Sequence, residues 1–93
     1  MGPEPSWKQL KSRMDRAPQE IGKFIERRTG CNHWDGEVGS PYAGREQMIQ
    51  MERKKLRCDD VDSDERKLRN NHRRTPKVLQ LITDTKDLPP ELR

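Results

Sequence analysis

The fold is decided by a helical stretch near the start of the chain, PQEIGKFIERRTG, residues 18–30. Its apolar side chains recur at the three- and four-residue spacing of one helix face: Ile21, Phe24 and Ile25. Pro18 disfavours helix at the residue before it, and Gly30 follows a basic turn in the position of a left-handed C′ residue. The stretch therefore predicts either a separate helix after a break near Ala17 or the second half of one kinked helix, with a loop after it.

Similar segments lie on both sides of this stretch and are separated by turn residues. The expected N-terminal caps are Ser6, Ser40 before Pro41, Asp62 or Ser63, and Thr75 before Pro76. The corresponding helices should end near Ala17, Arg57, Arg74 and the run at 87–90. No alternating run indicates a strand. We expect an all-α protein, a small bundle of four to five short helices with one long loop over residues 30–40.

Length and composition limit the size of the core. The chain has 93 residues, which is one domain, and is 28% hydrophobic and 39% charged. Typical values are roughly 45–50% and about 25%. We expect a leader at 1–5, a helical domain with a thin core at 6–88 and a flexible tail at 89–93, with a bound partner as one means of stabilising the core.

The chain shows neither a secretory signal nor an apolar run of the roughly 20 residues that a membrane span needs. We therefore expect a cytoplasmic protein, or one exported only as part of a larger carrier. Its formal net charge of +4 is a modest excess for a protein whose main task is to coat nucleic acid.

The expected loop concentrates reactive side chains in CNHWDGE, residues 31–37. An imidazole and carboxylates are the minimum set for general base catalysis or for holding a divalent cation. His33, Asp35 and Glu37 are therefore the candidate catalytic residues. Alternatively, Trp34 packs into the core while His33 and Asp35 bond to the backbone. The sequence leaves both interpretations open.

Two cysteines, Cys31 and Cys58, can form one disulfide outside the cytosol or remain free thiols inside it. A bridge would join two loops of a weak core. Together with His33 and His72 they also supply zinc-ligand types, but the gap between Cys31 and His33 is too short for the usual motif. The disulfide is favoured over a zinc site, while free thiols and the identity of any metal stay open.

The charges alternate in blocks: residues 53–57 are basic, 59–65 acidic and 66–77 basic again. The acidic block begins like a calcium-binding loop, but Glu65 stands where glycine is required and Asn71 where a glutamate is required. Helix capping explains the block better. The run NNHRR at 70–74 predicts either a solvated helix end or a phosphate-binding surface, through His72, Arg73 and Arg74.

One longer pattern suggests a family. Residues 24–37, with Tyr42, Arg45 and the segment LRCDD at 56–60, resemble the C-terminal toxin tips of bacterial polymorphic toxins of the Rhs type. The likeness covers roughly residues 20–85 and rests on a Cys-x-His-Trp-x-Gly-Glu core and a later Leu-Arg-Cys. It implies a nuclease or another cell-damaging enzyme neutralised by an immunity protein. It also implies His33 and Glu37 as active-site residues, with Arg45 and His72 as phosphate or transition-state contacts. The chain departs from the pattern in lacking the large carrier region, so an excised domain, a remnant and a coincidence all stay open.

Two functions are therefore carried forward. The first is a toxin-like effector that hydrolyses nucleic-acid phosphodiesters, with His33 as base or metal ligand, two carboxylates beside it and Arg45 or Arg73 against the phosphate. The second is a non-enzymatic helical adaptor that binds nucleic acid or an acidic protein through basic helix surfaces. The toxin is preferred on the resemblance alone. The sequence does not specify the substrate or the oligomeric state.

Overall fold

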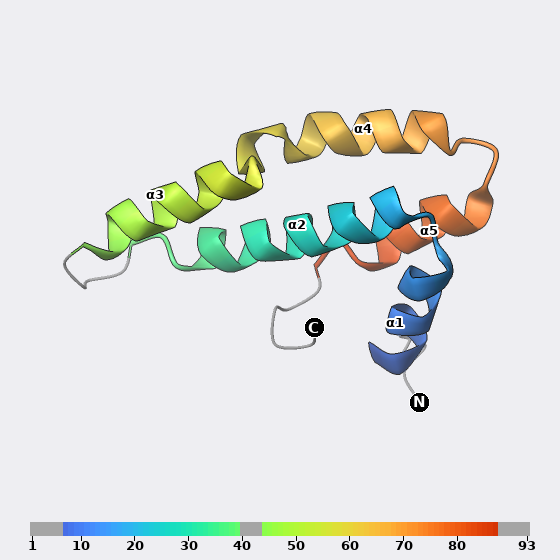
Figure 1. The fold of residues 1–93 in the computed structure, drawn as a ribbon, viewed down its shortest axis with the longest axis horizontal. Helices are drawn as coiled ribbons and strands as arrows, with labels where there is room; N and C mark the ends of the chain where they lie inside the picture. Colours follow the sequence, from blue (N-terminus) through green and yellow to red (C-terminus); the bar gives the residue numbers. More distant parts are fainter. Residues whose placement is uncertain (1–6, 40–43, 88–93) are drawn as a thin grey trace.

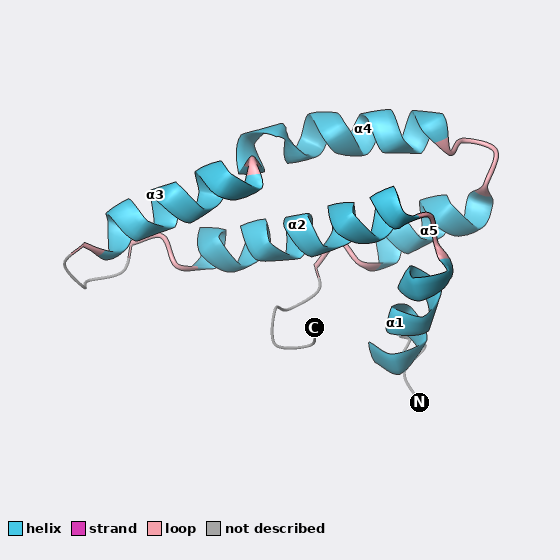
Figure 2. Ribbon diagram, in the orientation of Figure 1, coloured by secondary structure: helices cyan, strands magenta, loops and turns pink. Residues whose placement is uncertain are grey.

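The computed structural model describes residues 7–39 and 44–87, and every regular element in these ranges is helical (Figure 2). The elements in chain order are α1 (Trp7–Arg16), α2 (Gln19–Gly36), α3 (Arg45–Leu56), a 3-10 turn η1 (Cys58–Asp60), α4 (Val61–Asn71) and α5 (Pro76–Asp84). The prediction of an all-α protein is confirmed, with five α-helices in the two described ranges. Within these ranges no helix combines the length and the apolar character needed to cross a membrane.

Helix α2 is the axis of the fold (Figure 1). It contacts each of the other four α-helices. Helices α3 and α4 follow one another along one side of α2 and are joined by η1, whereas α1 and α5 contact each other and α2 (Figure 1). The result is a thin molecule of 46 × 34 × 18 Å.

The core follows the apolar face of α2. Its buried members are Leu10, Ile21, Phe24, Ile25, Cys31, Val61, Val78, Leu81 and Ile82. Ile21, Phe24 and Ile25 are among them, as their helical spacing predicts, and full burial of such a side chain contributes about 1.5–3 kcal/mol. Helix α3 adds little, because Ile49 is its one buried residue and Met48 is exposed.

The predicted long loop over residues 30–40 is wrong at its start, because α2 continues to Gly36. Gly30 lies inside the helix, where its lack of a side chain lets Leu56 of α3 pack closely against α2. A Cβ at this position would lie 3.0 Å from Cδ1 of Leu56. The left-handed glycine that follows α2 is Gly39, with a φ of 88°. The C-cap of α2 is Glu37, in the right-handed region, so the predicted left-handed glycine cap at Gly30 is wrong.

The other boundaries are partly as expected. The break at Pro18 and the start of α5 at Pro76 after Thr75 are confirmed. Helix α4 begins at Val61 after Asp60, not after Asp62 or Ser63. It also ends at Asn71, short of the predicted Arg74, and α5 ends at Asp84 before the predicted stop at 87. The predicted caps Ser6 and Ser40 with Pro41, the leader at 1–5 and the tail at 89–93 lie outside the described residues.

Candidate functional site

The three predicted catalytic residues lie on the last turns of α2 and at its C-terminal cap, not in a loop. His33 and Glu37 are four residues apart and share a face, whereas Asp35 lies two residues from each and projects elsewhere. Asp35 Oδ1 lies 2.9 Å from Nε of Arg53, and Glu37 Oε1 lies 3.3 Å from Nη2 of Arg45. The structure therefore does not bring the two carboxylates together, and each is held by an arginine of α3.

His33 is half-buried and packs edge-on against the indole of Trp34, with ring centroids 4.8 Å apart. The guanidinium of Arg45 lies over the same indole, 5.6 Å from its centroid. The imidazole and this arginine are thus both in contact with Trp34, which is itself half-buried. This arrangement packs the end of α2 against the start of α3, and the catalytic role of His33 stays a prediction.

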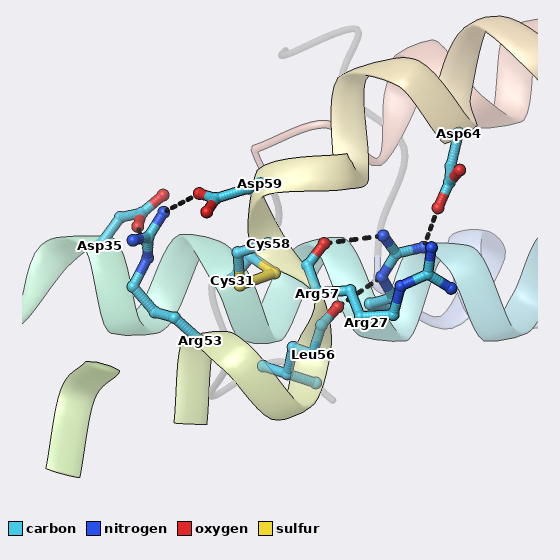
Figure 3. The surroundings of a disulfide bond; sticks show 9 residues. All are labelled: Arg27, Cys31, Asp35, Arg53, Leu56, Arg57, Cys58, Asp59 and Asp64. Atoms are coloured by element: carbon cyan, nitrogen blue, oxygen red, sulfur yellow. Dashed lines mark hydrogen bonds and ion pairs between the residues drawn. A yellow bond between two sulfur atoms is a disulfide. The ribbon is translucent and has the colours of Figure 1, made fainter. Parts of the chain in front are cut away.

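A disulfide joins Cys31 of α2 to Cys58 of η1, with their Cα atoms 5.5 Å apart (Figure 3). The sequence left a disulfide and free thiols open for these two cysteines, and the structure contains the disulfide. Bridged sulfurs are not zinc ligands, because zinc binds thiolates. Over the two described ranges, no group of three or more His, Cys, Asp or Glu side chains is placed to hold a metal ion.

Two arginines flank the disulfide (Figure 3). Arg27 donates from Nε to the carbonyl of Leu56 and from Nη2 to the carbonyl of Arg57 at 2.9 Å, and its Nη1 lies 2.9 Å from Asp64. It therefore satisfies carbonyls that the end of α3 leaves free. The turn there is sharp, because Arg57 has a left-handed φ of 54°.

The second flanking arginine, Arg53, bridges Asp35 at 2.9 Å and Asp59 at 3.4 Å. It thus connects the end of α2 with η1. We call the part of the molecule formed by the last turns of α2 with α3 and η1 the stapled end; it includes Cys31, Asp35, Glu37, Arg45, Arg53 and Cys58. Arg27, Arg45 and Arg53, which lie in or beside this region, all form ion pairs within the chain.

A buried arginine that the sequence analysis missed joins three helices. Arg28 is 4% exposed, and its Nη1 lies 2.9 Å from Glu65 of α4. Its Nη2 donates to the carbonyl of Ile82 at 2.6 Å and to Oγ1 of Thr85 at 3.0 Å, while Nε has no partner. The signal that could have found it is its position, because Arg28 is four residues after Phe24 and so falls on the apolar face of α2.

The charges of this cluster shift each other's pKa. Burial lowers the pKa of Arg28, and Glu65 opposes that shift. Burial alone would raise the pKa of the Glu65 carboxyl, but hydrogen bonds from Arg69 and Arg28 and their positive charges hold it below its ordinary value. The pair is therefore ionised at neutral pH and stabilises the junction of α2 with α4 and α5.

The predicted phosphate-binding residues are divided between the two ends of the fold. Arg45 begins α3 at the stapled end, whereas His72, Arg73 and Arg74 form the turn between α4 and α5. His72 Nε2 lies 2.6 Å from Glu20, and Arg73 donates to the carbonyl of Asn70 at 3.3 Å. Arg74 is exposed. Of these four predicted residues, only the three in the turn lie close enough together to contact the same ligand.

A groove of about 620 Å³ lies beside this turn, between α1 and α5. Its apolar lining comes from Ala17, Pro18, Val78 and Leu81, and its cationic lining from Arg13, Arg16 and Lys77 with His72. Arg13 pairs with Asp84 at 2.9 Å and so ties α1 to α5.

Arg16, Arg74 and Lys77 are all exposed, and across residues 7–39 and 44–87 none of them has an acidic side chain within ion-pair distance. We call the surface formed by Arg16, Arg73, Arg74 and Lys77 the basic end.

No protein-family model, no curated protein and no solved structure matches this chain. The resemblance to Rhs-type toxin tips stays a prediction, and so does the immunity protein that it implies.

Proposed function

We propose that the chain is a non-enzymatic helical binding module that engages an acidic partner through its basic end. The observation that carries the proposal is the set of exposed cations without ion pairs, Arg16, Arg74 and Lys77, beside a groove. Elsewhere Arg27, Arg28 and Arg53 are bound to carboxylates or carbonyls of the chain itself. Some exposed lysines in the described ranges, such as Lys54 and Lys86, also have no ion pair, so what distinguishes the basic end is the clustering of such cations beside the groove. A cation without an internal partner keeps its attraction for an external anion.

The sequence around the turn strengthens this attraction. Residues 66–77 contain six Lys or Arg and no Asp or Glu. Of the acidic residues in the preceding block, those at or next to η1 are exposed, and Asp60 there pairs with Arg57 at 3.1 Å. Asp64 and Glu65 are partly buried and pair with Arg27 and Arg28. Positive potential therefore concentrates at one end, where it raises the rate of encounter with an anionic partner and falls as salt is added.

The test reverses two groove cations and compares them with two cations elsewhere. The variant Arg16→Glu with Lys77→Glu is compared with Lys54→Glu with Lys86→Glu, which changes the net charge equally. Two labelled probes, a polyglutamate peptide and a single-stranded DNA oligonucleotide, are titrated at low and high salt. We expect the first variant to bind at least one probe about tenfold more weakly at low salt, with the difference shrinking at high salt. Equal weakening by both variants would contradict the proposal, because net charge alone would then explain binding.

The enzymatic hypothesis stays a prediction with its own test. Its two carboxylates are each engaged by an arginine of α3, Asp35 by Arg53 and Glu37 by Arg45, which gives it less support than the binding hypothesis. Growth of cells producing the folded wild type is compared with growth of cells producing His33→Ala. Toxicity that His33→Ala removes would favour the enzyme over the binding module, and normal growth in both would leave the binding module.

A further inference from the structure

The groove at the basic end combines an apolar surface with a cationic border. Ala17 and Pro18, at the connection between α1 and α2, are its accessible apolar residues. Val78 and Leu81 of α5 also line it, but they are 6% and 2% exposed and form its floor. The exposed guanidinium of Arg16 and the ammonium of Lys77 line the same groove. A ligand that fills it must therefore present apolar groups with negative charges around them.

We infer that this groove binds the apolar face of an acidic amphipathic helix of a partner protein, an inference that rests on the proposed function. A helix of this kind displays apolar side chains at three- and four-residue spacing and carboxylates beside them. The groove volume of about 620 Å³ lies within the range of about 300–1,000 Å³ in which proteins enclose ligand groups. It can take a few apolar side chains while Arg16 and Lys77 meet the flanking carboxylates.

A nucleic-acid strand fits the same surface less well. Single strands bind through aromatic side chains on which bases stack, and no Phe, Tyr or Trp lines this groove. A phosphate backbone would use the cations and leave the accessible apolar lining, made by Ala17 and Pro18, without a partner. Charge complementarity together with the apolar lining therefore favours the acidic helix.

The walls of the groove are already fixed by contacts within the chain. The pair between Arg13 and Asp84 at 2.9 Å holds α1 against α5, and the pair between His72 and Glu20 at 2.6 Å holds the turn against α2. A preformed groove reduces the ordering cost of binding.

The experiment uses the full oxidised chain and three labelled probes. The first is a peptide of about 14 residues, roughly four helical turns, with leucines on one helix face and glutamates elsewhere. The second has the same composition in an order that scatters the leucines around the helix, and the third is a single-stranded DNA oligonucleotide.

The key variant is Ala17→Arg, which removes apolar lining while adding a cation. Its matched control is Gln47→Arg, which adds the same charge at an exposed position of α3. Circular dichroism and thermal unfolding check that both variants fold.

We expect the wild type to bind the amphipathic peptide about tenfold more tightly than the scrambled one. Ala17→Arg should weaken that binding about tenfold and leave or tighten DNA binding, whereas Gln47→Arg should not weaken it. Equal binding of both peptides, with Ala17→Arg tightening every probe, would overturn the groove inference and leave the proposed function intact. Tighter binding of DNA than of either peptide would also overturn the inference in favour of a nucleic acid. If the variant Arg16→Glu with Lys77→Glu binds the probes as tightly as the wild type, the proposed function itself would be contradicted.

Discussion

The stapled end and the basic end both carry arginines, and they differ in what those arginines contact. At the stapled end Arg53 holds Asp35 and Asp59, and Arg45 holds Glu37. At the basic end Arg74 and Arg16 are exposed, with no acidic partner in the part of the chain that the structure describes. Residue type alone would rank the stapled end as the functional one. The contacts show that its charges hold the fold together, and they leave the basic end with attraction for an external ligand.

The disulfide gives the largest expected difference between the two ends. Cys31 and Cys58 enclose a segment with a sequence separation of 27. Closing a loop of that length stabilises a protein by roughly 3.5 kcal/mol in the chain-entropy model. We expect the double variant Cys31→Ala with Cys58→Ala to lose about that much free energy of unfolding, measured by urea denaturation.

The control for the disulfide variant is the wild type treated with a thiol reductant, which should shift the urea midpoint in the same direction. If neither removal nor reduction lowers the midpoint, helix packing alone would hold the stapled end. The disulfide would then not be what makes the stapled end more stable than the basic end.

The second prediction concerns the junction that connects the two ends. Glu65→Gln leaves the charge of Arg28 buried without its carboxylate, and removing one partner of a buried pair costs about 3 kcal/mol. The matched control is Glu52→Gln, because Glu52 pairs with Lys55 on the surface at 3.0 Å and such pairs contribute about 0–1 kcal/mol. Urea denaturation at neutral pH measures both. Equal losses would show that Arg28 does not depend on Glu65.

The same pair predicts how stability changes with pH. The pKa of Glu65 is lowered in the folded protein, so its ionised form stabilises the fold above the unfolded pKa of about 4.3. That contribution is lost as the pH falls through the folded pKa. The pKa of Asp84 is also lowered, by hydrogen bonds from Gln80 and Arg13 and by the charge of Arg13, although burial opposes this shift. The decline in stability below about pH 4.3 should be shallower in Glu65→Gln than in the wild type.

Sequence patterns predicted the helices better than the site, for physical reasons. Helical spacing and prolines report on local structure, so the break at Pro18 and the start of α5 at Pro76 followed from them. The role of Gly30 depends on Leu56, which is remote in sequence, so a glycine that permits close helix packing was interpreted as a helix end. A helix that ends at Gly30 would place Arg28 in an exposed last turn, whereas in the structure Arg28 is buried inside α2.

The smallest expected effect tests whether α2 is packed more closely at the stapled end than near the basic end. Gly22 and Gly30 are both interior to α2, and alanine in place of glycine favours a helix by about 1 kcal/mol. At Gly22 the nearest atom to an added Cβ is the carbonyl oxygen of Met14 at 3.9 Å, so Gly22→Ala should raise the free energy of unfolding by most of that amount. At Gly30 the added Cβ would lie 3.0 Å from Cδ1 of Leu56, so displacement of that side chain should cancel the gain.

Thermal and urea unfolding of the two single variants measure this difference. An equal gain from both would mean that Leu56 moves aside without cost, because its flexible side chain can adopt another rotamer. The double variant Gly30→Ala with Leu56→Ala separates these cases: if the contact with Leu56 is what opposes alanine at Gly30, the substitution should regain its helix-forming benefit once the leucine is shortened. A benefit that stays absent in that background would place the constraint in the backbone of the crossing, and not in the side chain of Leu56.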